Sequence, residues 1–312
     1  MNTLKTNIDE FIELYNMPLD ELISISSKIT KENFGNDVEF CSIISAKTGK
    51  CQENCKYCSQ SGHYNTKIEC HELVSLEQVK SAALSAKDNG ATRFCVVTSG
   101  RKPEKKDFPE LLKMIETVAS IEGLNSCCSL GILSEEEIMQ LKNSGLKRYN
   151  HNLNTCKSFH KDICTTHDYE DRINTVKLIK ENGIEACTGG IIGMGETRRQ
   201  RIELALELAE LDPVSVPINI LHPVEGTPLQ DRKEAINEEE ILKTLAIYRI
   251  IMPKALIRYA GGRATRLSEE NQKTGIKAGV NALLVGNYLT TTGIKIEDDL
   301  ELIKTSGKNL MQ

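Results

Sequence analysis

The sequence predicts an α/β protein, a (β/α)8 TIM barrel with a helical N-terminal extension. Eight short apolar runs alternate with longer amphipathic stretches, which is typical of parallel strands joined by helices. Eight is also the number of strands at which such a sheet closes into a barrel. No low-complexity linker interrupts the 312 residues, so we expect a single domain over residues 1–312. The competing arrangement is an open doubly wound sheet.

The elements follow in chain order. Residues 1–35 should form the helical extension, since an apolar stripe recurs at helical spacing at Leu14, Leu22, Ile25 and Ile29. The barrel should occupy residues 36–292, and residues 293–312 should form a C-terminal tail. Strands are predicted at residues 40–45, 92–98, 125–130, 146–152, 184–192, 214–220, 256–260 and 282–285. Helices are predicted near residues 75–89, 107–121, 134–143, 168–182, 196–211, 237–252 and 269–278.

Capping residues support several of these helices. Side chains that accept hydrogen bonds from the first helical turn stand at the expected starts: Ser75, Ser134 with Glu137, and Asp168 with Asp171. Glycines that tolerate a left-handed backbone stand at the expected ends: Gly90, Gly145, Gly183 and Gly279.

Composition excludes several classes of function. The net charge of -5 and the pI near 5.8 give no basic surface for nucleic acid or anionic lipid. No apolar run is long enough to span a bilayer, and no secretory signal is visible at the N-terminus, so a cytoplasmic location is expected. Eleven cysteines is an odd and high number for such a chain. Reduced, metal-bound thiols explain it better than a disulfide framework.

The strongest motif is a C-x3-C-x2-C triplet, Cys51, Cys55 and Cys58, directly after the first predicted strand. In a barrel, that loop lies at the C-terminal mouth, where active sites form. Three thiolates cannot complete a structural zinc site, which takes four ligands. They can hold three corners of a 4Fe–4S cluster and leave one iron open. The alternative is three incidental loop cysteines, or part of a zinc site completed elsewhere.

A second set of metal-ligand candidates lies within predicted strands. Cys95, Cys127 and Cys187 fall in the second, third and fifth strands, and Arg258 interrupts an apolar strand. A lone strand cysteine is more often a small core residue. Three of them, together with an arginine that needs a partner when buried, favour a second cluster inside the barrel. Cys128 follows Cys127, and adjacent strand residues face opposite sides, so it stays open which of the two faces inward.

Polar residues and the remaining cysteines complete the sequence analysis. Asn150, Asn152 and Asn154 alternate along the fourth strand and should share one face, suited to a ligand with both donors and acceptors. The alternative is a polar layer satisfied by its neighbours. His151 should face the other way and make a structural hydrogen bond. Thiols without a partner at metal spacing are expected to be core or surface residues, namely Cys41, Cys70, Cys156 and Cys164.

The triplet, with Tyr57 before its last cysteine, resembles the radical S-adenosylmethionine (radical SAM) superfamily. More closely, the chain resembles the biotin synthase family over residues 40–292. The segments that carry this resemblance are 51–61, 149–153, 165–166, 187–190, 193–196, 215–219, 226–229, 258–263 and 289–291.

The resemblance implies a sulfurtransferase that converts dethiobiotin to biotin. A 4Fe–4S cluster on Cys51, Cys55 and Cys58 would bind S-adenosylmethionine at its open iron, and reductive cleavage would give a 5′-deoxyadenosyl radical that abstracts hydrogen. The inserted sulfur would come from an auxiliary cluster held by Cys95, Cys127, Cys187 and Arg258. A 2Fe–2S cluster is expected there, and a larger one stays open, with Cys128 as a possible participant.

The resemblance also assigns binding residues and partners. Cofactor contacts are expected from Tyr57, Asn152, Asn154 and Arg172. Substrate contacts are expected from Asn150, Asn152, Asn219, Thr290 and Thr291. The expected partners are an electron donor such as flavodoxin or ferredoxin, iron–sulfur assembly proteins and a second copy of the chain in a homodimer.

Three positions depart from the family's usual residues: Asn154 replaces Asp, Gln52 replaces Pro, and Ala264 replaces Glu. The first changes the expected ribose contact, because an amide donates as well as accepts hydrogen bonds. Two other functions stay open, a radical SAM maturase or amino-acid mutase without sulfur insertion, and a protein that only carries a cluster. The second cysteine set argues against the former, and the asparagine row against the latter.

Overall fold

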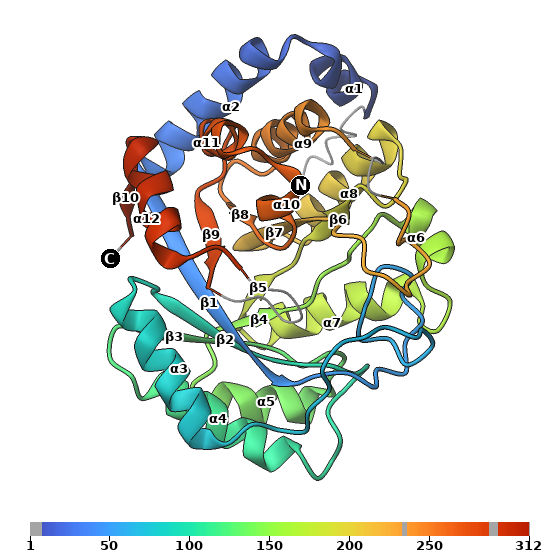
Figure 1. The fold of residues 1–312 in the computed structure, drawn as a ribbon, viewed down its shortest axis with the longest axis vertical. Coiled ribbons are helices and arrows are strands. Elements are labelled where there is room, and N and C mark those ends of the chain that lie inside the picture. Colours follow the sequence, from blue (N-terminus) through green and yellow to red (C-terminus); the bar gives the residue numbers. More distant parts are fainter. Residues whose placement is uncertain (1–7, 233–235, 287–292, 312) are drawn as a thin grey trace.

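A computed structural model describes residues 8–232, 236–286 and 293–311 (Figure 1). All strand pairs are parallel, and the first barrel strand pairs with both the second and the last, so the sheet is closed. This confirms the barrel and excludes the open sheet. The barrel strands are β1 (Asp37–Lys47), β2 (Arg93–Thr98), β3 (Asn125–Ser129), β4 (Arg148–Asn150), β5 (Glu185–Cys187), β6 (Gly190–Ile192), β7 (Ser215–Ile220), β8 (Leu256–Tyr259) and β9 (Ala282–Val285).

The fifth predicted strand is interrupted rather than continuous. It forms β5 and β6, both paired with β7, separated by Thr188 and Gly189. A Cβ atom on Gly189 would lie 2.0 Å from the carbonyl oxygen of Pro217, so the backbone approaches β7 too closely for a side chain. The neighbouring segment fills the break, since Asn154 N donates to the Gly189 carbonyl (3.1 Å).

Helices cover the outside of the barrel (Figure 1). They are α3 (Leu76–Asp88), α4 (Phe108–Ala119), α5 (Glu135–Asn143), α6 (Lys157–Ile163), α7 (Tyr169–Glu181), α8 (Arg198–Glu210), α9 (Glu238–Ile251), α10 (Arg263–Arg266) and α11 (Glu269–Lys277). The predicted caps at Ser75 and Ser134 are confirmed as capping boxes. No helix among the described residues is both long and apolar enough to cross a membrane.

The N-terminal extension is helical from residue 8 onward, as predicted, while residues 1–7 lie outside the described residues; its buried face agrees only in part with the predicted apolar stripe. It forms α1 (Ile8–Asn16) and α2 (Leu19–Phe34), and α2 lies against α9. Ile25 is 37% exposed, whereas Leu22, Ser26 and Thr30 are buried. The Thr30 hydroxyl donates to the Ser26 carbonyl (2.9 Å), so it can be buried without loss of a hydrogen bond. The apolar stripe in the sequence therefore placed Leu22 and Leu14 correctly and Ile25 wrongly.

The predicted C-terminal tail contains regular structure. It includes α12 (Ile296–Thr305) and β10 (Asn309–Leu310), which extends the sheet beside the start of β1. A buried ion pair attaches α12 to the barrel, with Arg263 Nη2 2.6 Å from Asp299 Oδ1. Both side chains are 1% exposed, so this contact excludes water.

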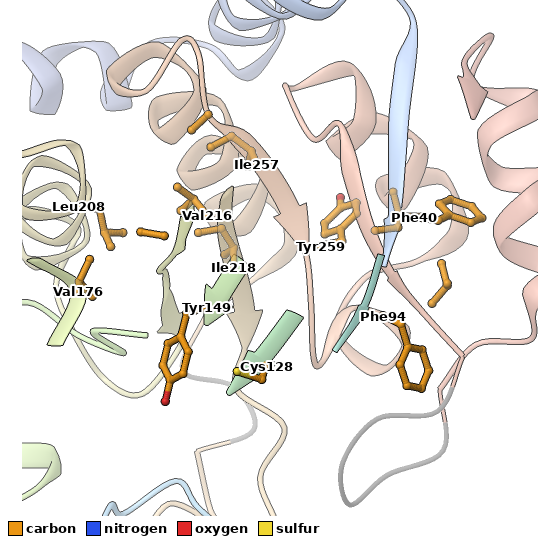
Figure 2. Packing of buried hydrophobic residues seen from close by; sticks show 14 of the residues in the cluster. Phe40, Phe94, Cys128, Tyr149, Val176, Leu208, Val216, Ile218, Ile257 and Tyr259 are labelled. Carbon is orange, nitrogen blue, oxygen red and sulfur yellow. The ribbon is translucent and has the colours of Figure 1, made fainter. Parts of the chain in front are cut away.

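Side-chain alternation divides the core into two regions. The outer core lies between sheet and helices and contains Phe40, Phe94, Cys128 and Tyr149 (Figure 2). The residues next to three of these in sequence, Cys41, Cys95 and Cys127, pack together as a separate cluster inside the barrel. The alternation settles which residue of the pair faces inward: Cys127 does, and Cys128 belongs to the outer core.

Candidate active site

The cysteine triplet lies on the irregular loop that follows β1. Backbone hydrogen bonds fold this loop back on itself: Cys51 N donates to the Gln60 carbonyl (3.0 Å), and Gly62 N donates to the Cys51 carbonyl (2.7 Å). Within the loop, Cys58 N donates to the Cys55 carbonyl (3.0 Å). The three cysteines line one cavity of about 220 Å³ at the barrel mouth. Three thiols around one space fit an iron–sulfur cluster, whose preferred protein ligands are thiolates.

A chain of hydrogen bonds fixes the opposite wall of this cavity. Arg172 donates from Nη1 to the Asn152 carbonyl (2.7 Å) and from Nε to His167 Nε2 (2.9 Å). Because a guanidinium can only donate, His167 Nε2 must accept, and the ring proton lies on Nδ1. That proton is directed at Glu53 Oε2, 2.5 Å away. The guanidinium of Arg172 is therefore held in position beside the cysteine loop.

Cys164 also belongs to this site, although the sequence analysis assigned it no partner. Its Sγ lies 3.6 Å from Cys55 Sγ and 3.3 Å from His167 Nδ1. The hydrogen bond with Cys164, together with burial, raises the pKa of the Cys55 thiol. Cys164 stands at no recognisable metal-ligand spacing from the triplet, so sequence spacing gave no signal. Cys164 is buried, as expected for a core thiol, but its contacts with Cys55 and His167 were not predicted.

His151 contradicts its predicted role as a structural hydrogen-bonding residue. It lines the same cavity as the cysteine triplet, and its Nε2 atom has no hydrogen-bond partner among the described residues. Burial lowers its pKa well below the usual value, so the ring is neutral. The alternation argument failed because β4 ends at Asn150 and residue 151 is no longer in a strand.

A second cavity, of about 320 Å³, lies deeper in the barrel. Cys95, Cys127, Cys187 and Arg258 all line it, so the structure brings the four residues of the second predicted set together. Residues at the boundary line both cavities, namely Val97, Ser129, Asn150 and Asn152. The two sets of sulfur donors thus open into adjoining spaces.

The asparagines are arranged around this boundary. Asn150 Nδ2 donates to Asn152 Oδ1 (3.2 Å) and lies 3.3 Å from Cys187 Sγ. Asn219 lines the deeper cavity and accepts from Gly261 N at 2.9 Å. Asn154 lines only the outer cavity, where its amide donates to the Tyr57 hydroxyl. The predicted row of three therefore spreads over two cavities.

The floor of the deeper cavity is a buried ion network centred on Glu39. Its carboxylate pairs with Arg258, with Arg148 at 2.9 Å and with Arg93 at 3.6 Å. Burial alone would favour the protonated carboxyl, but the three guanidinium groups outweigh it and lower the pKa of Glu39 to about 2. Arg258 is thus paired, as its burial requires.

The remaining predicted residues are two threonines and three cysteines. Thr290 and Thr291 lie outside the described residues. Cys70 is exposed and Cys156 is buried in the outer core, as expected for a surface thiol and a core thiol. Cys41, which was expected to be of the same kind, instead lines the deeper cavity.

Comparisons with known proteins agree with this geometry. The profile of the Radical SAM superfamily matches residues 46–209, and that of the Biotin and Thiamin Synthesis associated domain matches residues 217–309. Among solved structures, methylornithine synthase shares the fold with a TM-score of 0.82 at 20% identity, covering 98% of this chain and 94% of that one. The FeFe-hydrogenase maturase HydG from Carboxydothermus hydrogenoformans shares it with a TM-score of 0.80 at 17% identity, covering 96% and 74%.

Closer relatives are found by sequence. A biotin synthase of Acetivibrio thermocellus is 46% identical over 301 residues, which cover 96% of this chain and 93% of the relative. A biotin synthase of Clostridium tetani is 45% identical over 308 residues, which cover 99% and 94%. Since these relatives match nearly the whole chain at such identity, the chain belongs to the biotin synthase family of the radical SAM superfamily.

Proposed function

We propose that this enzyme converts dethiobiotin to biotin by inserting sulfur between two saturated carbons. The observation that carries the proposal is the pair of adjoining cavities, each lined by its own set of cysteines, with Asn150 and Asn152 on the boundary. A reaction that generates a radical and then supplies sulfur needs two such centres on either side of one substrate. Neither isomerisation of an amino acid nor cluster storage requires the second set.

The outer cavity suits the radical-generating half of the reaction. Cys51, Cys55 and Cys58 would hold a 4Fe–4S cluster, with Tyr57, Asn152, Asn154 and Arg172 around S-adenosylmethionine. When reduced, that cluster supplies the electron that cleaves S-adenosylmethionine and so gives the carbon radical that removes hydrogen from the substrate. The chain's own contribution is positioning, since Arg172 is held by two hydrogen bonds before any ligand binds.

The boundary between the cavities suits the substrate. The cyclic urea of dethiobiotin carries N–H donors and a carbonyl acceptor, and an asparagine amide can meet both. Asn150, Asn152 and Asn219 would hold this ring, with Thr290 and Thr291 at the substrate carboxylate. The deeper cavity, which Cys95, Cys127, Cys187 and Arg258 line, would contain the auxiliary cluster, expected to be 2Fe–2S.

Family membership also suggests the setting of the enzyme. We expect a homodimer in the cytoplasm, reduced by a flavodoxin or ferredoxin and supplied by iron–sulfur assembly proteins. These partners are inferred from the family rather than from any contact described above.

Single-turnover chemistry tests the proposal. The protein is reconstituted anaerobically with iron and sulfide, then mixed with dethiobiotin, S-adenosylmethionine and a reductant. Wild type should form 5′-deoxyadenosine and biotin, both measured by mass spectrometry. Cys55→Ala should abolish both products, whereas Cys187→Ala should keep some cleavage of S-adenosylmethionine and lose biotin. Cys156→Ala, in the outer core, is the matched control. Normal biotin formation by Cys187→Ala would contradict the assignment of the sulfur donor.

A further inference from the structure

Cys41 lies inside the barrel, beside the cysteines of the deeper cavity. It is 6% exposed and packs in one cluster with Cys95 and Cys127. It also lines the cavity that Cys187 and Arg258 line. Its place follows from alternation along β1, since its neighbour Phe40 packs in the outer core. The described residues therefore bring four thiols to this cavity.

Four is the number of protein ligands that closes either common type of cluster. Both 2Fe–2S and 4Fe–4S clusters are typically held by four cysteines. With Cys95, Cys127 and Cys187 alone, one coordination position on the cluster would lack a protein ligand. Two residues on the wall of the cavity are available for the fourth position, Cys41 and Arg258.

The contacts of Arg258 disfavour it as that ligand. To bind iron, a guanidinium nitrogen must present a lone pair, which the protonated group does not have. Here Nη2 is paired with Glu39, Nη1 donates to the Leu283 carbonyl (3.2 Å), and Nε lies 3.4 Å from Ser215 Oγ. The protein thus holds Arg258 as a cation, with its donor atoms directed at oxygen acceptors.

The charges around the cavity suit a cluster held by thiolates. Three guanidinium groups, of Arg93, Arg148 and Arg258, meet two carboxylates, Glu39 and the partly exposed Glu185. The network therefore has an excess of positive charge, which is costly in a buried site unless an anion compensates it. A cluster held by thiolates carries net negative charge and would compensate it, so the choice of the fourth ligand depends on geometry and not on this charge.

We infer that Cys41 is the fourth ligand of the auxiliary iron–sulfur cluster, with Arg258 as a cationic neighbour rather than an iron ligand. The inference rests on the proposed function, because that function supplies the auxiliary cluster. Cys128, the other extra thiol near this site, is excluded because it faces the outer core.

The test begins from a full-length background in which Cys51, Cys55 and Cys58 are all alanine. After anaerobic reconstitution this background should hold only the auxiliary cluster. Iron X-ray absorption should then show sulfur scatterers alone, and a nitrogen scatterer in the first shell would overturn the inference. This measurement needs no change at Cys41, so it does not depend on how a Cys41 variant folds.

Substitutions in the same background give a second, independent readout. Cys41→Ser should shift the Mössbauer and visible spectra, because an oxygen donor replaces sulfur on one iron. Arg258→Met and Cys128→Ser should leave the spectra unchanged, and circular dichroism checks the fold of each. A shift with Arg258→Met and none with Cys41→Ser would overturn the inference. A background protein that binds no cluster at all would instead overturn the proposed function.

Discussion

The Sγ atoms of Cys55 and Cys164 lie 3.6 Å apart, although one residue is in the loop after β1 and the other ends α6. Asn54 Oδ1 and His167 Nδ1 each lie 3.3 Å from the Cys164 sulfur, so its position is well defined. When no cluster is bound, the two thiols can react with each other to form a disulfide bond. Because the two sulfur atoms are so close, an oxidant could join the loop after β1 to the C-terminal end of α6 through a disulfide bond.

We therefore predict that mild oxidation of the cluster-free protein by diamide joins Cys55 to Cys164. The bond would take away a ligand of the proposed 4Fe–4S cluster, so iron uptake should fall by more than half until dithiothreitol is added. Peptide mass spectrometry identifies the bond, and iron analysis measures uptake. Cys164→Ser should keep its uptake after diamide, and Cys156→Ser should behave as wild type. Equal loss of uptake in Cys164→Ser would show that another oxidation is responsible.

Substitutions at Asn154 can distinguish the role of its left-handed backbone conformation from the role of its side-chain amide in binding. Its φ of 69° lies in the left-handed region, where asparagine and glycine are tolerated and alanine costs about 1 kcal/mol. Asn154→Ala should lower the free energy of unfolding by about 1 kcal/mol more than Asn154→Gly in urea titrations. Both variants lose the amide that bonds Tyr57, so both should raise the KM for S-adenosylmethionine to a similar extent. Should only the alanine variant raise it, the amide makes no contact with the cofactor.

The buried pair of Arg263 and Asp299 should dominate the attachment of α12. Removing the cation leaves a carboxylate with no compensating charge, so Arg263→Leu should destabilise the protein by about 3–5 kcal/mol. The double variant Arg263→Leu with Asp299→Leu should recover most of that loss. Urea unfolding measures both, with Lys273→Ala as a control at an exposed ion pair, where about 0–1 kcal/mol is expected. No recovery in the double variant would assign the loss to packing.

Glu240 should make the stability of the protein depend on pH. Burial raises its pKa, but hydrogen bonding to Arg198 and the charge of Arg201 outweigh burial, so the pKa of Glu240 is lowered in the folded state. Its contribution is therefore complete above the unfolded value of 4.5 and is lost as the pH falls below it. In urea titrations between about pH 6 and about pH 4, Glu240→Gln should lose less stability than wild type. Parallel curves would mean that Glu240 contributes nothing to this dependence.

The sequence predicted the barrel and the second cysteine set because both depend on local patterns. Apolar runs mark strands, and Cys95, Cys127 and Cys187 lie inside those runs. Cys41 also lies inside a predicted strand, but its neighbours are set by strand register, which a single sequence does not reveal. If the outward orientation of Phe40 had been known, alternation along the strand would have placed Cys41 inside the barrel.

Other differences have similar physical causes. Cys164 reaches the cluster loop through the fold of residues 151–167, which contains only short regular elements. On α2 the stripe placed Leu22 correctly, but the buried face continues over Ser26 and Thr30 rather than over Ile25, because the Thr30 hydroxyl is satisfied by the Ser26 carbonyl. His151 was misassigned because alternation was extended beyond the end of β4.

The charged floor around Glu39 has a consequence for how the auxiliary cluster would be renewed between turnovers. Glu39, Arg93, Arg148 and Arg258 are each less than 7% exposed, so in the described part of the chain this network is closed to bulk water. If the proposed function holds, iron or sulfide that replaces what a turnover consumes would enter from the same end as S-adenosylmethionine. Renewal of the auxiliary cluster and binding of S-adenosylmethionine would then use the same end of the barrel. The product would therefore have to leave before the sulfur source is renewed.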